Sequence, residues 1–148
     1  MIKITLDVND HVIKKNNRPI FYNRGTKVHF IGKSKDLANA ENYLELKLRS
    51  EKNRLRIETI TYPISVCYRF YFAEKNSRKF KACDLSNLFE IVSDALQASE
   101  IIKNDNLIQS FDGSRKIQTR NNFNSLEIEI TQYLEGIGLP DNQTTLFD

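Results

Sequence analysis

Four acidic residues in the second half of the chain are of the type that can bind a divalent metal ion. Asp84, Glu90 and Asp94 fall within one segment, and Asp105 follows in a polar turn. Clustered carboxylate oxygens bind hard divalent cations, which activate water and stabilise charge on a leaving oxygen. Asp is also favoured at helix starts and in turns, so Asp84 and Asp105 have a purely structural interpretation as well. Metal-assisted hydrolysis is the chemistry that this group would support.

The basic residues concentrate in the N-terminal part of the chain. The 148 residues have a net charge of +3, but residues 1–56 carry +7 and residues 57–148 carry −4. A basic surface that neutralises phosphates, with carboxylates gathered elsewhere, is the distribution expected of a metal-dependent nuclease. A solvated helix face with charged loops is the alternative that charge alone leaves open. The near-neutral sum therefore does not exclude a nucleic-acid partner.

Hydrophobic periodicity predicts one α+β domain that positions the acidic residues. Strands are predicted over residues 1–8, 55–60, 64–72, 107–111 and 126–131, and helices over residues 34–52 and 84–98. A long polar loop, interrupted by residues 20–22, separates the first strand from the first helix, and further irregular segments are predicted at 75–81 and 113–124. The prediction is a mixed β-sheet of about five strands with two main helices over residues 1–135, followed by a flexible tail over residues 136–148.

Composition excludes several classes of protein. No apolar run reaches the ~18 residues of a membrane-spanning helix, and the first residues alternate with charge instead of forming a signal-peptide core. Cys67 and Cys83 do not have zinc-site spacing, and His11 and His29 are isolated. We therefore expect a soluble, cytoplasmic protein whose metal chemistry uses oxygen ligands.

The segment from Lys81 to Ile108 resembles the RusA family of Holliday junction resolvases. That family has a D-x-D-N-L-x-K helix start, a D-A-L helix end and an acidic pair before a hydrophobic strand. The matching positions here are Asp84, Asn87, Leu88, Asp94-Ala95-Leu96 and Asp105. The runs Asn16-Asn17-Arg18 and Asn23-Arg24-Gly25 are similar to the family's N-terminal loop, so the resemblance covers roughly residues 1–131. Two positions depart from the family motif, since Ser86 replaces an aspartate and Glu90 replaces a lysine.

The resemblance implies a RusA-like fold and a homodimeric, Mg²⁺-dependent endonuclease, with Mn²⁺ as a possible substitute. Its substrate would be branched DNA, a four-way junction that the dimer resolves by paired nicking. Asp84 and Asp105 would be metal ligands, with Glu90 or Asp94 as supporting acids. We hypothesise that Glu90 supplies the missing carboxylate and that Ser86 is a neutral or water-mediated ligand. The alternative is a weakened or non-catalytic site that still binds junctions.

Two further sets of residues are candidate contacts with partners. Phosphate contacts would come from the cations of the two basic loops, and Phe80 beside them could stack on a base or pack against the core. These cations are Lys14, Lys15, Arg18, Arg24, Lys75, Arg78, Lys79 and Lys81, with Arg115, Lys116 and Arg120 as additions. At the C-terminus, Gln143, Leu146 and Phe147 resemble the Q-x-x-L-F motif that docks bacterial repair proteins on the sliding clamp.

Overall fold

The computed structural model describes residues 1–8, 20–23, 25, 28–31 and 35–134. The described helices are α1 (Lys35–Leu55), α2 (Ser77–Ala82) and α3 (Leu85–Ala98), with 3₁₀ turns η1 (Glu74–Asn76) and η2 (Asp105–Leu107). The strands are β1 (Ile2–Asp7), β2 (Ile20–Asn23), β3 (Val28–Ile31), β4 (Ile64–Phe72), β5 (Ile108–Ser110), β6 (Arg115–Gln118) and β7 (Ser125–Gln132).

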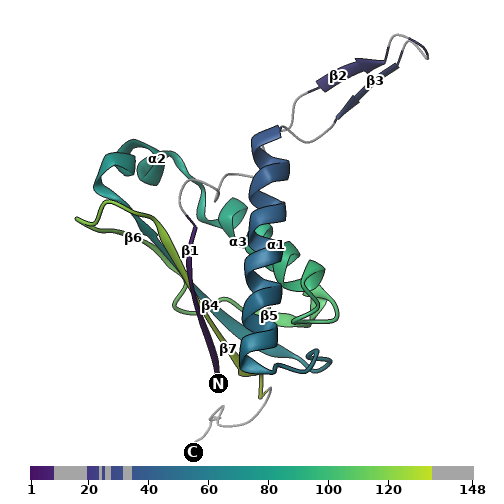
Figure 1. The fold of residues 1–148 in the computed structure, drawn as a ribbon, viewed down its shortest axis with the longest axis vertical. Coiled ribbons are helices and arrows are strands. Elements are labelled where there is room, and N and C mark those ends of the chain that lie inside the picture. Colours follow the sequence, from purple (N-terminus) through teal and green to yellow (C-terminus); the bar gives the residue numbers. More distant parts are fainter. Residues whose placement is uncertain (9–19, 24, 26–27, 32–34, 135–148) are drawn as a thin grey trace, which may run out of the picture.

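A mixed five-stranded sheet forms the centre of the fold (Figure 1). β7 lies between β1 and β4 and pairs with both in antiparallel orientation. The other edge of β4 is shared by β5 and β6, which pair with it in parallel, one after the other along its length. This arrangement brings the turn that precedes β5, which contains Asp105, to the edge of the sheet beside the start of β4.

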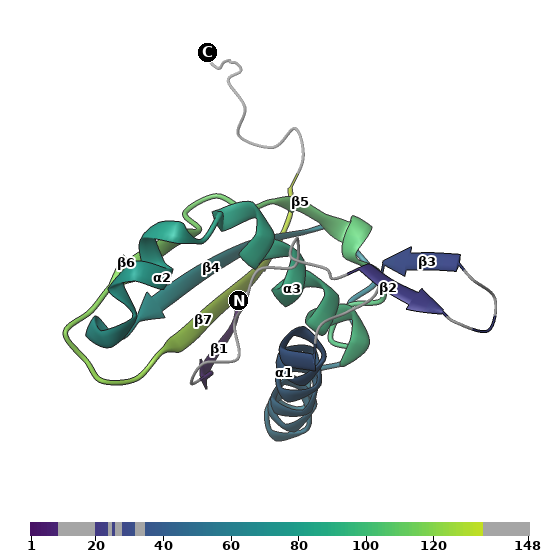
Figure 2. The same cartoon turned by 90° about the horizontal axis from the view of Figure 1, so that it is seen from above.

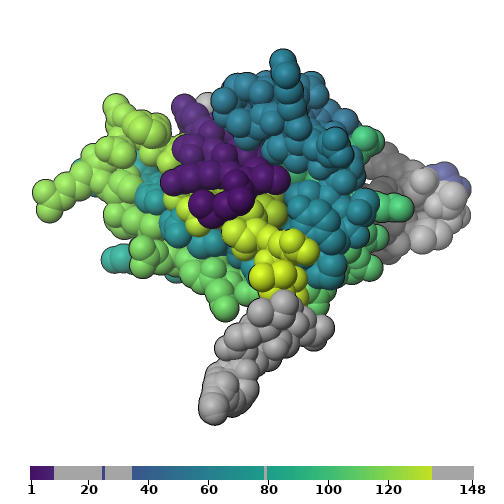
Figure 3. Space-filling view, turned by 90° about the horizontal axis from the view of Figure 1, so that it is seen from below, coloured from purple at the N-terminus to yellow at the C-terminus, as the bar shows by residue number. Residues whose placement is uncertain are grey.

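Helices α1 and α3 cover one face of this sheet (Figure 2). α1 buries Leu37, Ala40, Leu44 and Leu48, which recur at helical spacing. β4 alternates buried and partly exposed residues along its whole length, so that every second side chain enters the core. The hairpin of β2 and β3 lies apart from this body (Figures 1 and 2). Figure 3 shows β1 and β7 side by side at the surface from below.

Both long helices end in the same hydrogen-bonded motif. Arg56 and Glu100 have left-handed backbone conformations, with φ of 53° and 64°. The next amide donates back to the helix in each case, from Ile57 to the Lys52 carbonyl at 3.0 Å and from Ile101 to the Leu96 carbonyl at 3.1 Å. These are Schellman motifs, which normally have glycine at the left-handed position.

Gly113 and Ser114 lie in the loop that connects β5 to β6. Gly113 has φ of +84°, and a Cβ there would lie 3.3 Å from Cys67 Sγ. The Ser114 hydroxyl oxygen then accepts a hydrogen bond of 2.8 Å from the Tyr68 amide. A side chain thus supplies the acceptor that β4 needs where the two parallel strands are interrupted.

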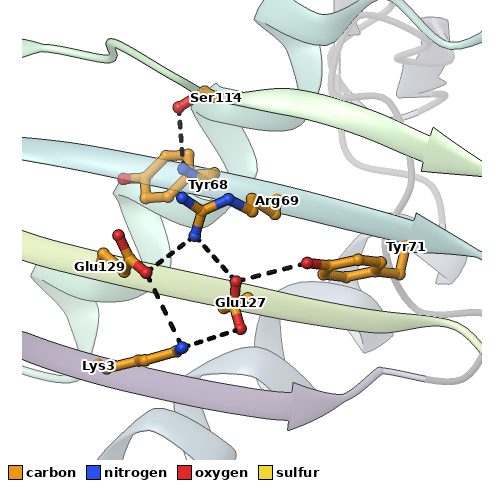
Figure 4. A network of polar contacts seen from close by, with 7 residues as sticks. All are labelled: Lys3, Tyr68, Arg69, Tyr71, Ser114, Glu127 and Glu129. Carbon is orange, nitrogen blue, oxygen red and sulfur yellow. Dashed lines mark hydrogen bonds and ion pairs between the residues drawn. The ribbon is translucent and has the colours of Figure 1, made fainter.

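The opposite face of the sheet carries a charged network (Figure 4). Arg69 Nη1 donates to carboxylate oxygens of Glu127 and Glu129, each at 2.9 Å, and Lys3 approaches the same two carboxylates. Burial alone would raise the pKa of Glu127, but hydrogen bonds and charges from Arg69 and Lys3 together lower it below its ordinary value of 4.5. The network therefore ties β1, β7 and β4 together on this face.

The structure confirms the predicted α+β fold, its strands near residues 1–8, 64–72, 107–111 and 126–131, and its two main helices. The predicted strand over 55–60 is wrong: α1 continues to Leu55, and only Ile60 forms a bridge, to Ile102. The segments predicted as irregular contain short elements, namely β2 and β3 before α1, η1 and α2 within residues 74–82, and β6 within residues 113–124.

No helix in the described ranges is long and apolar enough to cross a membrane. The predicted tail over residues 136–148 lies outside the described residues.

The charged network predicts a specific pH dependence of stability. Because the pKa of Glu127 is lowered in the folded state, its stabilising contribution is present above about pH 4.5 and is lost as the pH falls further. Glu127→Gln should lower the free energy of unfolding by about 1–2 kcal/mol at pH 7. In urea titrations this difference should shrink below pH 4.5. Glu58→Gln, at an exposed position, is the control, and an equal pH profile for the two variants would contradict the assignment.

Candidate active site

One face of α3 forms a wall of a cavity. Ser86, Phe89, Glu90 and Ser93 follow the i, i+3, i+4, i+7 spacing of a single helix face, and all four line a cavity of about 310 Å³. The neighbouring face of the helix buries Leu88, Ile91, Val92, Ala95 and Leu96 in the core. Because those apolar residues fix the rotation of α3, the polar stripe faces the cavity.

The opposite wall comes from the turn and strand that follow α3. Asp105, Ile108 and Phe111 complete the lining of the cavity. The fold therefore brings Glu90 and Asp105, two of the predicted acidic residues, together with Ser86, which departs from the family motif. Ser86 and Glu90 share one face of α3, and Asp105 from η2 lines the same cavity because α3 packs back against the sheet.

Asp84 and Asp94 are not among the residues that line this cavity. Asp84 is the N-cap of α3, where its carbonyl accepts from the amides of Asn87 and Leu88 and its carboxylate accepts from Asn87 Nδ2 at 3.2 Å. Asp84 therefore stands at the N-cap position of α3 without a side-chain capping hydrogen bond, and its role as a metal ligand stays a prediction. Asp94 is partly exposed on α3.

Hydrogen bonds hold Asp105 in position at the edge of the cavity. Its amide donates to Gln97 Oε1 at 2.9 Å, which ties the turn to the last part of α3. The Asn104 side chain accepts from the Asn106 amide, also at 2.9 Å, and so starts the 3₁₀ turn η2. The prediction of a turn at Asn104–Asn106 is confirmed.

A buried pair of hydroxyl groups lies beneath the cavity. Tyr68, fully buried on β4, shares a hydrogen bond of 2.9 Å with Ser93, which also lines the cavity. Burial raises the pKa of the Tyr68 hydroxyl, and the negative charge of nearby Asp105 adds to this effect. Tyr68 therefore keeps its proton. This pair was not among the predicted site residues; the only signal for it in the sequence is that Tyr68 and Ser93 each fall on the inner face of their own element.

Three of the described candidate cations lie just before α3, whereas Arg115 and Arg120 are exposed on β6 and just after it. Lys75, Arg78 and Lys81 are exposed on η1 and α2. Side chains of the other predicted phosphate contacts, Lys14, Lys15, Arg18, Arg24 and Lys79, lie outside the described residues.

Two residues suggested for nucleic-acid contact stabilise the turn before α3. Lys116 Nζ donates to the carbonyl oxygens of Phe80 and Cys83, each at 2.7 Å, and so caps the end of α2. Phe80 packs edge-on against Phe72 at 5.6 Å between ring centroids and is partly buried. Phe80 therefore packs against the core, which was one of its two predicted roles. The suggested contact of Lys116 with DNA stays a prediction.

The cavity offers a donor set that suits a hard divalent cation. Two carboxylates and a hydroxyl lie along its walls, and Mg²⁺ in proteins is held by one or two carboxylates together with water and substrate phosphate oxygens. Within the described part of the chain there is no group of three or more His, Cys, Asp or Glu side chains close enough to hold a metal ion. A metal at Glu90 and Asp105 would therefore keep much of its coordination shell for water and substrate.

The hydrogen bond from Asp105 to Gln97 predicts a local effect on the cavity edge. Gln97→Ala removes the acceptor, so exchange of the Asp105 amide should accelerate by about two- to tenfold while global stability changes little. Amide hydrogen exchange measured by NMR tests this. Gln132→Ala, at an exposed position near the end of β7, is the control; an unchanged Asp105 exchange rate in Gln97→Ala would show that the hydrogen bond does not restrain the turn.

Comparison with known families agrees with this geometry. The family model described as Endodeoxyribonuclease RusA matches residues 11–131, a range that includes β4, α3 and every residue lining the cavity. A search of curated proteins gave no match. The match spans well over half of the chain, and the predicted resemblance is confirmed: the chain belongs to the RusA family of endodeoxyribonucleases, the Holliday junction resolvases.

Proposed function

We propose that this protein is a divalent-metal-dependent endonuclease that resolves four-way DNA junctions by paired nicking. Family membership implies nuclease activity on Holliday junctions, and such enzymes generally require a divalent metal. The observation that carries the proposal for this chain is the shared cavity of Ser86, Glu90 and Asp105. Glu90 lies where it can compensate for the aspartate that Ser86 replaces.

Each residue of the cavity would have a distinct role. Asp105 and Glu90 would supply carboxylate oxygens to Mg²⁺ or Mn²⁺, and Ser86 would contribute its hydroxyl directly or through water. When bound, the metal supplies activation of the attacking water and stabilisation of charge on the leaving oxygen. Asp84, next to this wall at the helix start, would be an outer acidic residue, and Asp94 a more distant one.

The cations of η1 and α2 would hold the DNA backbone beside the cavity. Lys75, Arg78 and Lys81 are exposed in the segment that leads directly into α3. Phosphate neutralisation by these side chains would make junction binding weaken steeply as salt is raised.

The protein would act as a homodimer. A four-way junction has approximate two-fold symmetry, and paired nicking requires two active sites related by the same symmetry. One domain of this size carries a single copy of the cavity, so the second would come from another chain.

A junction-binding protein without nuclease activity is the second candidate function. It is favoured by the two departures from the family motif, Ser86 and Glu90, and by the presence of only two acidic residues among the described residues that line the cavity. The exposed cations beside the cavity would serve binding equally well.

Cleavage of a labelled four-way junction across a Mg²⁺ titration separates the two functions. We expect paired nicks that appear with Mg²⁺, and we expect Asp105→Asn and Glu90→Gln each to lower the rate by roughly 10²-fold or more, as follows when a group that holds transition-state charge is lost. Mg²⁺ binding by isothermal titration calorimetry should weaken in the same variants.

Matched controls are Asp36→Asn and Glu58→Gln, both at exposed positions outside the cavity. A junction that is retarded in a gel but stays intact at every Mg²⁺ concentration would favour the binding protein. Full activity of Glu90→Gln would remove Glu90 from the proposed metal site.

We also propose that the C-terminal residues bind the bacterial sliding clamp. The proposal rests on the sequence Gln143-Thr144-Thr145-Leu146-Phe147, in which two adjacent apolar residues follow a polar stretch. Such a pair is recognised by an apolar pocket on a partner. Leu146→Ala combined with Phe147→Ala should abolish clamp binding in calorimetry while junction cleavage is unchanged; equal clamp affinity for the wild type and the double variant would contradict the proposal.

A further inference from the structure

The cavity has an aromatic wall as well as an acidic one. Phe89 on α3 and Phe111 after β5 lie nearly parallel, with ring centroids 4.6 Å apart and 10° between the planes. Both rings line the cavity and are only partly buried. The ring of Tyr68 on β4 contacts each of them edge-on, with 5.8 Å between its centroid and the centroid of either phenylalanine. The two rings are therefore held in fixed orientation by a third that is fully buried.

The size and lining of the cavity fit one nucleotide unit. A volume of about 310 Å³ is at the lower end of the range for small-ligand sites. The acidic side chains repel a bare phosphate, so a phosphate approaches them only through a cation. The aromatic wall instead attracts a nucleobase, because every nucleobase has a π-face that stacks on an aromatic ring. Ser86 also lines the cavity, and its hydroxyl can hydrogen-bond to a base edge.

We propose that Phe89 and Phe111 form a subsite for an unpaired nucleobase adjacent to the phosphodiester that is cut. Because Phe89 is stacked with both Phe111 and Phe70, the base stacks on the face of Phe111 that Phe89 does not cover. The phosphate next to it meets the metal held by Glu90 and Asp105. A base must leave its neighbours in the duplex to enter such a cavity, which is easiest at the branch point of a junction. This inference rests on the proposed nuclease function and adds the group that the cavity recognises.

Photo-cross-linking tests the subsite directly. A four-way junction carries 5-iodouracil at either nucleotide flanking the mapped cut, and it is irradiated in complex with the full chain, with Ca²⁺ replacing Mg²⁺ so that the DNA is not cut. We expect the cross-link to map by mass spectrometry to Phe89 or Phe111. Cross-links found only at other residues would overturn the proposal.

Kinetics of one conservative variant provide a second readout. Phe111→Leu keeps an apolar side chain but removes the stacking ring, so kcat/KM for junction cleavage should fall by at least about fivefold. Phe123→Leu, whose ring is 46% exposed between β6 and β7, is the matched control and should keep full activity. Equal activity of the two variants would overturn the proposal. Because the cross-link is measured on the wild-type chain, the test does not depend on the folding of Phe111→Leu.

The outcomes also separate this inference from the nuclease proposal. Nicked products without a cross-link to either phenylalanine would leave the nuclease function standing and remove the subsite. A cross-link at Phe89 or Phe111 without nicking at any Mg²⁺ concentration would support the base subsite in a protein that binds junctions and does not cut them.

Discussion

The packing of α3 against β4 is the constraint on which the candidate site depends. Leu88, Ile91 and Leu96 are fully buried, and they meet the inward side chains of β4, of which Tyr68 is fully buried. Turning α3 about its axis would expose these apolar residues, at a cost of about 1.5–3 kcal/mol for each. This packing therefore fixes the polar residues of α3, Ser86, Glu90 and Ser93, on the side of the helix that lines the cavity. The hydrogen bond between Tyr68 and Ser93 adds a polar contact of fixed geometry at the centre of this packing.

Side-chain hydrogen bonds tie both ends of α3 to neighbouring elements. At its start, Lys116 on β6 binds the carbonyl of Cys83, the residue before the N-cap Asp84. Near its end, Gln97 accepts a hydrogen bond from the Asp105 amide. Asp105 lines the cavity opposite α3, so this helix also holds the opposite wall in position. The parallel pairing of β4 with β5 fixes the same turn from the other side. Two carboxylates from different elements are thereby kept at one cavity.

Apart from the three-residue strand β5, the elements that sequence patterns predicted are those long enough for periodicity to be read. β4, with nine residues of unbroken alternation, and the helices α1 and α3 are of this kind. β6 is four residues long and exists because its backbone pairs with β4, which no local pattern records. The predicted strand at 55–60 failed because α1 ends in a Schellman motif at Arg56, where the usual glycine signal is absent. Ser86, Glu90 and Asp105 were predictable as candidates from the family motif, whereas their common cavity, and its aromatic wall of Phe89 and Phe111, follow only from tertiary packing.

The location of a bound metal ion tests the central claim most directly. In a crystal of the protein soaked with Mn²⁺, anomalous diffraction identifies the ion without reference to activity. If Glu90 and Asp105 form the metal site, we expect a peak about 2.0–2.6 Å from carboxylate oxygens of both residues, with Ser86 in contact directly or through water. A peak bound to Asp84 or Asp94 with no oxygen from Glu90 would contradict this site.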